Sequence, residues 1–177
     1  MENQRIRLSK QMLKDALLRL LAEQEPDKIS VYALCQEAQI NRTTFYRYYG
    51  SIADVMNEIK DTFIEQLEVR ILDDGSDPLA SLAETLSFFW QNRELINILL
   101  RVYPEEQILG ELLKRQSVLN QLDLSVSDPA SDWKKEYGLH YTIYGSYAVI
   151  RKWLASTENI PPREIAALIL DLTQKTD

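Results

Sequence analysis

The sequence has almost no cysteine or histidine: its 177 residues include one of each, Cys35 and His140. One cysteine cannot form a disulfide within the chain, and this pair cannot supply the ligands of an ordinary structural zinc site. A Cys–His nucleophile pair would need a supporting motif, and none surrounds either residue. We therefore expect no disulfide framework, no metal site and no cofactor.

Long apolar runs are also missing, and glycine and proline are scarce, at 5 and 6 residues. No run approaches the roughly 18 apolar residues that a membrane-spanning helix needs. The opening stretch MENQRIRLSK leads into an amphipathic segment, which predicts no signal peptide and a cytoplasmic location. There is no glycine-rich phosphate loop, metal cluster or nucleophile motif, so we do not expect an enzyme. The 45% hydrophobic content is enough to bury a core.

The negative charge is unevenly distributed along the chain. The net charge is −7, yet residues 1–50 carry eight Lys or Arg and six Asp or Glu, a balance of +2 that leaves −9 for the rest. Between Glu37 and Asp54 there is no acidic residue, whereas Arg42 and Arg47 both lie there. A surface that tolerates phosphate is therefore expected only in this window.

Apolar residues recur at helical spacing and no strand-like alternation is sustained, which predicts an all-α fold. We expect about nine helices in two domains, a helix-turn-helix domain at 1–51 and a helical domain at 52–177. The expected helices lie at about 9–24, 31–38, 42–48, 52–72, 78–91, 93–102 and 104–121, followed by a long helix to about Ser156 and a last one opened by Pro161 and Pro162. A break at 73–78 and a polar loop at 124–132 separate them.

Several predicted helix starts carry capping residues. Ser9 is preceded by Leu8, whose spacing from Leu13 predicts a hydrophobic staple. The other expected N-terminal caps are Ser30, Asn41 and Ser51, the last with Asp54 in a near capping box.

Two short predicted helices, separated by Gln39, Ile40 and Asn41 and preceded by a longer amphipathic helix, have the outline of a helix-turn-helix. In the second short helix Phe45 and Tyr49 are four residues apart, so both should face the core.

The other side of that helix is polar and basic, and we expect it to face DNA. Arginine can bind phosphate or guanine, threonine can meet a thymine methyl group, and a tyrosine hydroxyl can hold a phosphate oxygen. The predicted DNA-binding residues are Ser30, Arg42, Thr43, Thr44, Tyr46, Arg47 and Tyr48. Alternatively, Tyr46 packs against the helix expected at 9–24, Tyr48 makes no DNA contact, and Arg42 and Arg47 are solvated charges. Cys35 is most simply a small core residue.

Residues 9 to about 65 resemble the N-terminal DNA-binding domain of TetR-family transcriptional regulators, through the signature SVYALCQEAQINRTTFYRYYGSIADV. The stretch YGLHYTIYGSYAVIRKWLASTENIPPREIAALI is similar to the last two helices of a TetR-type C-terminal domain common in low-GC Gram-positive bacteria. The resemblance implies an all-α homodimer that binds double-stranded operator DNA through its N-terminal domain and a small organic effector through its C-terminal domain, with no membrane partner.

Two positions depart from the family pattern. Gln39 stands where the family usually has glycine in the turn, which would cost about 1 kcal/mol if that backbone is left-handed. Ile52 stands where the family usually has a lysine that contacts phosphate. We expect its loss to weaken operator binding and to flatten the salt dependence.

The C-terminal domain offers a tyrosine face that could line an effector pocket. The predicted pocket residues are Phe89, Tyr103, Tyr137, Tyr141 and Tyr144. The alternative interpretation is ordinary core packing. His140 either titrates near the pocket or is an ordinary surface or packed residue.

A strip of small residues on the same long helix would allow another helix to approach closely, and with the last helix it predicts a dimeric four-helix bundle. The predicted interface residues are Gly138, Thr142, Gly145, Val149, Ile165, Leu168, Ile169 and Leu172.

The function predicted from these features is sequence-specific regulation of transcription by a repressor that a small molecule releases. The alternative is a helical protein-interaction module that has kept the fold and lost operator binding, for which Ile52 and the overall acidity are the motive.

Overall fold

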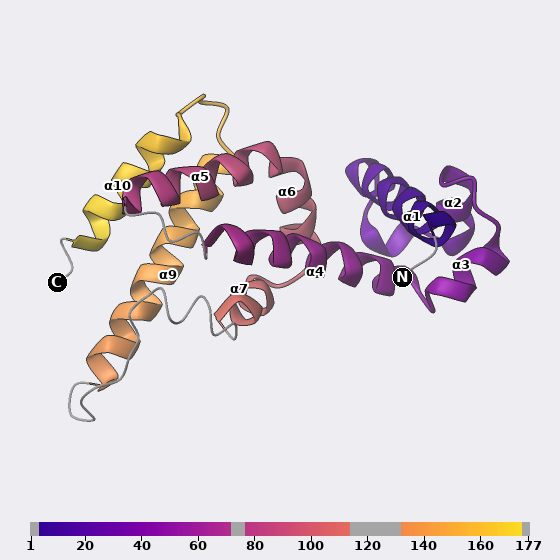
Figure 1. Ribbon diagram of the computed structural model, residues 1–177, viewed down its shortest axis with the longest axis horizontal. Coiled ribbons are helices and arrows are strands. Elements are labelled where there is room, and N and C mark those ends of the chain that lie inside the picture. The colour runs from indigo at the N-terminus through magenta and orange to yellow at the C-terminus, as the bar shows by residue number, and fades with distance from the viewer. Residues whose placement is uncertain (1–3, 72–76, 114–131, 175–177) are drawn as a thin grey trace. The chain divides into compact units, whose positions relative to one another are not determined.

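The computed structural model describes residues 4–71, 77–113 and 132–174 (Figure 1). Within these ranges the chain forms nine α-helices and no strand, which confirms the predicted all-α class. The elements are α1 (Gln4–Glu23), a 3-10 turn η1 (Pro26–Lys28), α2 (Val31–Glu37), α3 (Arg42–Tyr48), α4 (Ile52–Ile71), α5 (Pro78–Gln91), α6 (Arg93–Val102), α7 (Glu105–Leu113), α9 (Asp132–Leu154) and α10 (Pro162–Gln174).

Some sequence predictions fall outside the described residues. They are most of the break at 73–78, the part of the 104–121 helix beyond Leu113, and almost all of the loop at 124–132. In the described ranges no helix is long and apolar enough to cross a membrane.

The chain divides into two compact units. One comprises Met1–Glu65 together with Glu94–Pro104, and the other comprises Gln66–Arg93 and Glu105–Asp177. Helix α4 contributes residues to both. The expected domain boundary between residues 51 and 52 remains a prediction.

The core of the first unit joins α1, α2 and α3. Leu13 and Leu17 of α1, Leu34 of α2 and Phe45 of α3 are all fully buried. Helix α1 packs on α2, and α2 on α3 (Figure 1). Because α2 and α3 have only seven residues each, tertiary packing rather than intrinsic helix propensity stabilises them.

The predicted cap at Ser9 is wrong, because α1 begins at Gln4. Ser9 lies inside the helix, where its hydroxyl donates to the Arg5 carbonyl oxygen at 3.0 Å. A serine hydroxyl can be satisfied in this way without ending a helix. Leu8 is 61% exposed, so the predicted staple is absent as well.

The other three caps form as predicted. Ser30 Oγ accepts from the Ala33 amide at 3.1 Å, and Asn41 Oδ1 accepts from the Thr43 amide at 2.9 Å. At the start of α4, Ser51 Oγ accepts from the Asp54 amide at 3.2 Å while Asp54 Oδ2 accepts from the Ser51 amide at 2.9 Å, which completes a capping box.

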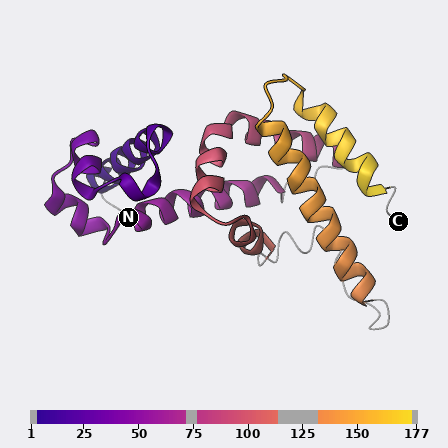
Figure 2. The same ribbon diagram turned by 180° about the vertical axis from the view of Figure 1, so that it is seen from behind.

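The second unit is built around the packing of α5 against α10, which lie alongside each other in both views (Figures 1 and 2). Trp90 of α5 stacks on Trp153 of α9, with ring centroids 5.1 Å apart. Trp153 Nε1 donates to the Ile160 carbonyl oxygen at 2.9 Å, which fixes the connection into α10.

Candidate nucleic-acid interface and effector pocket

The turn between α2 and α3 sets the direction of the second short helix. Gln39 has φ 53°, a left-handed backbone, and is the one non-glycine residue with positive φ in the part of the chain that the structure describes. The Ile40 amide donates to the Cys35 carbonyl oxygen at 2.9 Å and the Gln39 amide donates to that of Gln36 at 3.1 Å. This pair of bonds is a Schellman motif, in which glycine is the usual residue at the position of Gln39.

Helix α3 buries one side as the sequence spacing predicts. Phe45 is fully buried and Tyr49 is 4% exposed, with ring centroids 6.0 Å apart. Burial raises the pKa of the Cys35 thiol, although the nearby Arg42 opposes the shift. A thiol of this kind is inert, as expected for a small core residue.

The opposite side of α3 is open to solvent. Tyr46 is 53% exposed, and its ring and that of Phe45 are T-shaped to each other with centroids 5.2 Å apart. Arg42, Thr43 and Arg47 are exposed. Among the other predicted DNA-binding residues, Thr44 and Tyr48 are half-buried, and Ser30 is exposed at the cap of α2. The exposed face is therefore polar and cationic, and DNA contact by these residues remains a prediction.

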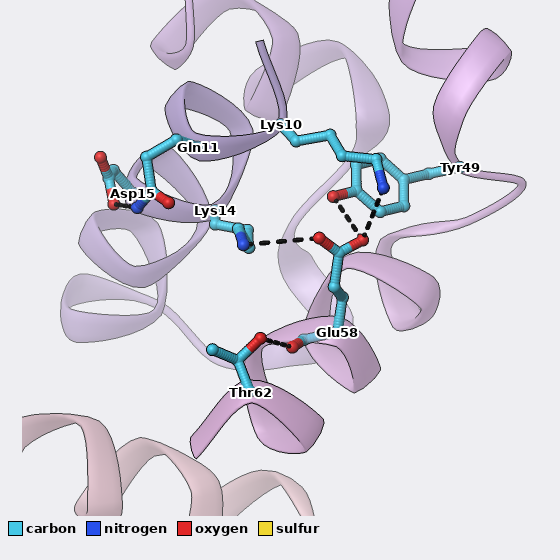
Figure 3. A network of polar contacts seen from close by, with 7 residues as sticks. All are labelled: Lys10, Gln11, Lys14, Asp15, Tyr49, Glu58 and Thr62. Atoms are coloured by element: carbon cyan, nitrogen blue, oxygen red, sulfur yellow. Dashed lines mark hydrogen bonds and ion pairs between the residues drawn. The ribbon is translucent and has the colours of Figure 1, made fainter. Parts of the chain in front are cut away.

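A carboxylate that the sequence did not single out joins three elements of this unit. Glu58 Oε2 of α4 accepts from the Tyr49 hydroxyl at 3.0 Å and pairs with Lys10 Nζ at 3.2 Å (Figure 3). Its other oxygen lies 3.4 Å from Lys14 Nζ. We call these four residues the Glu58 cluster. They come from separate elements, with the lysines more than 40 residues before Glu58, and belong to no motif, so their meeting could not be predicted.

The cluster favours the ionised carboxylate. Burial opposes ionisation of Glu58, but the hydrogen bonds from Tyr49 and Lys10 and the charges of Lys10 and Lys14 outweigh it, and the pKa of Glu58 is held below its ordinary value.

The segment 94–104 belongs to the same compact unit as α1, α2 and α3. The Tyr103 hydroxyl donates to Asn57 Oδ1 at 2.7 Å, and Lys60 Nζ lies 5.3 Å from the centroid of the Tyr103 ring. The Arg101 guanidinium donates to the Leu21 carbonyl oxygen at the end of α1. Tyr103, one of the predicted pocket residues, thus binds to α4.

The second unit contains an open cavity of about 510 Å³ beside α9. It is lined by Glu105, Tyr144, Tyr147, Ala148, Arg151, Lys152 and Ala155. Two of these lining residues form an ion pair, with Arg151 Nη1 3.1 Å from Glu105 Oε2. Burial raises the pKa of Tyr147, and the Glu105 carboxylate adds to this effect.

Of the predicted pocket residues, Tyr144 lines this cavity. Tyr137 and Tyr141 lie on the same helix and are 71% and 65% exposed, and Phe89 is half-buried next to Phe88, with centroids 6.4 Å apart. The His140 ring stacks on Tyr144 with centroids 5.9 Å apart. In the described part of the chain no group of His, Cys, Asp and Glu could hold a metal ion.

The predicted dimer-interface residues differ in how far they are buried within the chain. Gly138 and Gly145 of α9 are exposed, and a Cβ added at either would meet no atom within 4 Å. Thr142 and Val149 are half-buried. In α10, Ile165 and Ile169 are buried within the chain, whereas Leu168 and Leu172 are 46% and 47% exposed.

A compact helix-turn-helix unit with a cationic outer helix, followed by a larger helical region, defines the class of DNA-binding transcriptional regulators. The sequence profile described as "Bacterial regulatory proteins, tetR family" matches residues 13–59, and the one described as "Transcriptional regulator C-terminal region" matches residues 76–175. The chain belongs to the TetR family of bacterial transcriptional regulators.

Individual relatives agree with this assignment. An uncharacterized HTH-type transcriptional regulator of Bacillus subtilis (strain 168), YxbF, is 22% identical over 171 residues, which are 92% of this chain and 44% of that protein. The chain thus spans less than half the length of this relative.

Solved structures share the fold. A TetR transcriptional regulator of Streptococcus agalactiae 2603V is 22% identical, with 96% of both chains covered and a TM-score of 0.70. A tetR-family regulator of Streptomyces coelicolor is 18% identical, with 94% of this chain and 81% of that chain covered and a TM-score of 0.68. The dihydroxyacetone kinase operon activator DhaS is 18% identical, with 94% of both chains covered and a TM-score of 0.61.

Proposed function

We propose that this protein is a homodimeric repressor that binds double-stranded operator DNA in the cytoplasm, is released by a small organic effector and catalyses no reaction. The observation that carries the proposal is the division of α3 into a buried side and an exposed side. Phe45 and Tyr49 hold the helix in the domain, while Arg42, Tyr46 and Arg47 are left exposed. A helix held from behind in this way can enter a major groove.

The residues take different parts in this function. Arginines can bind guanine edges or phosphates, Thr43 and Thr44 can meet bases or backbone, and Tyr46 and Tyr48 can donate to phosphate oxygens. The Ser30 hydroxyl already accepts from the Ala33 amide as the cap of α2. Ser30 would therefore meet a phosphate at the N-terminal end of α2, where backbone amides point outward. We assign DNA reading to residues 1–51, and dimerisation and effector binding to residues 52–177.

The proposed effector is an aromatic or amphipathic organic molecule of low charge. The cavity beside α9 offers the rings of Tyr144 and Tyr147 as apolar area, and the Arg151–Glu105 pair as orienting donors and acceptors. This mixture of aromatic surface with a few polar groups suits a small organic ligand. The cations and the carboxylate nearly balance, which disfavours a multiply charged ligand.

Selection of bound fragments from the genome of the host, with the full-length protein at low salt, tests the proposal. We expect one or a few enriched fragments with a pseudo-palindromic site, protected in footprinting with half-sites about 34–36 Å apart. Transcription from a reporter with that site gives the sign of regulation, which matters because the structural relative DhaS is named an operon activator. If repression by the wild-type protein is absent, the repressor proposal is wrong.

The second candidate is an interaction module without operator binding. It is favoured by Ile52, which is half-buried at the first position of α4 and offers no positive charge to a phosphate. Failure to retain any duplex even at low salt, with the protein folded, would establish this candidate in place of the first.

A further inference from the structure

Helix α3 is short and its orientation depends on what fixes its two ends. Its N-terminal end is set by the Asn41 cap and the Gln39 turn. At its other end the Gly50 and Ser51 amides donate to Asp54 Oδ2 at 2.8 and 2.9 Å, which fixes the backbone of the turn into α4. These bonds leave the direction of the helix axis to side-chain contacts.

The Glu58 cluster supplies such a contact on the buried side of α3. The Tyr49 hydroxyl, at the C-terminal end of α3, reaches Glu58 on the second turn of α4, and Figure 3 shows Lys10 and Lys14 of α1 converging on the same carboxylate. Lys10 Nζ also lies 5.6 Å from the centroid of the Tyr49 ring. One side chain therefore connects α1, the end of α3 and α4.

We propose that Glu58 is a positioning residue, which fixes the end of α3 relative to α1 and α4 and so sets which base edges the outer side chains of α3 reach. The proposal rests on the proposed operator binding. Glu58 acts through Tyr49 and needs no contact with DNA of its own. Its side chain is 33% exposed, so charge-assisted hydrogen bonds rather than full burial hold it in place.

Positioning makes a distinctive prediction because specific and non-specific binding respond differently. Base contacts need a fixed helix direction, whereas attraction to phosphates depends mainly on charge. A change that loosens α3 should weaken specific binding alone. Removing a negative charge should leave non-specific binding equal or stronger.

The first experiment compares Glu58→Gln and Tyr49→Phe with the wild type in binding to two probes. These are the duplex that the full-length protein selects from a randomised library and random-sequence DNA of the same length. We expect each variant to lose about tenfold in affinity for the selected duplex, the usual scale for a hydrogen bond to a charged group. Binding to random-sequence DNA should not weaken. Parallel losses on both probes, or no loss on the selected duplex, would overturn the proposal.

Glu37→Gln is the matched control. Glu37 Oε1 pairs with Arg19 Nε of α1 at 2.7 Å, so this variant makes the same charge change and also removes an ion pair to α1. It leaves the end of α3 alone. We expect its affinity for the selected duplex to stay within about twofold of the wild type, because exposed ion pairs contribute little.

The second experiment needs no DNA and separates this proposal from the proposed function. Amide hydrogen exchange of the full-length protein should show protection of residues 45–49 reduced by about tenfold in Glu58→Gln and Tyr49→Phe, with residues 13–21 unchanged. Unchanged protection of residues 45–49 would overturn the positioning role. A wild-type protein that selects no duplex would contradict operator binding, and the exchange result would then decide the positioning role alone.

Discussion

At the scale of single residues, Gln39 shows where local backbone strain is tolerated. A left-handed backbone costs a residue with a side chain roughly 1–2 kcal/mol, which glycine avoids. The two Schellman hydrogen bonds of Ile40 and Gln39 hold this conformation in place. The resemblance to the family predicts a free-energy cost at Gln39 if its backbone is left-handed. The observed φ of 53° confirms that the backbone is left-handed.

We predict that Gln39→Gly raises the free energy of unfolding by about 1 kcal/mol, because it relieves the left-handed backbone. Gln36→Gly is the control: it makes the same replacement within α2, at an exposed position, and should lower the free energy by about 1 kcal/mol. Urea unfolding at one fixed protein concentration measures both. Destabilisation by both replacements would contradict the strain argument.

The two sides of α3 should respond differently to truncation. Phe45→Ala should cost about 3–5 kcal/mol of stability, as a fully buried aromatic side chain. Tyr46→Ala and Arg47→Ala should leave the melting temperature nearly unchanged and lose binding to the selected duplex, because both side chains are exposed. Thermal unfolding and fluorescence anisotropy separate the two effects. The opposite pattern would show that the assignment of the two sides is wrong.

At the scale of helices, capping residues in the sequence were sufficient to predict most of the helix N-termini. They were insufficient to predict contacts between helices. Caps at Ser30, Asn41 and Ser51 were predictable because they join neighbours in sequence. Ser9 misled because the residues before it also form helix, so a capping residue alone does not fix a start. The bond from Tyr49 to Glu58 joins separate elements, and no periodicity in the sequence reports it.

The pH dependence of stability should reveal the link between α1, α3 and α4. The pKa of Glu58 is lower in the folded state than in the unfolded chain, so its contribution is present above the unfolded pKa and is lost as pH falls through the folded one. We predict that the difference in free energy of unfolding between wild type and Glu58→Gln is greatest at neutral pH and shrinks as pH falls below about 4. Urea unfolding at several pH values measures it, with Glu37→Gln as the control for net charge. A difference independent of pH would contradict the depressed pKa.

At the scale of the whole molecule, a long-range contact decides where a segment belongs. The prediction of one domain at 52–177 includes residues 93–102, and that boundary remains a prediction. In the structure Tyr103 bonds to Asn57, 46 residues earlier, and 94–104 lies in the same compact unit as α1, α2 and α3. Helical periodicity predicts which face of a helix is buried, but it does not predict which other element packs against that face. The same limit applies to the cavity, where Tyr144 was predictable as part of a tyrosine face but its neighbours Glu105 and Arg151 were not.

Helix α9 carries two glycines that its own chain does not require. Glycine within a helix costs about 1 kcal/mol relative to alanine, and neither Gly138 nor Gly145 has a neighbour close enough to exclude a methyl group. Leu168 and Leu172 of α10 are also exposed. We propose that these residues and the two glycines belong to a surface that a second copy approaches closely. A stable interface there would bury about 1,200–2,000 Å².

We therefore predict that the wild-type protein is a dimer at micromolar concentration, and that Gly145→Leu converts it to a monomer by placing a bulky side chain where the second copy would approach. Gly145→Ala should dimerise more weakly than the wild type while gaining helix propensity, and Leu168→Glu should also yield monomer. Gly110→Leu is the control. A Cβ at Gly110 also meets nothing within 4 Å, but Gly110 lies on α7, outside the predicted dimer interface. Light scattering coupled to size-exclusion chromatography gives the mass, and circular dichroism checks that each variant is helical. A monomeric mass for the wild type, or dimers that persist in both Gly145→Leu and Leu168→Glu, would place the interface elsewhere.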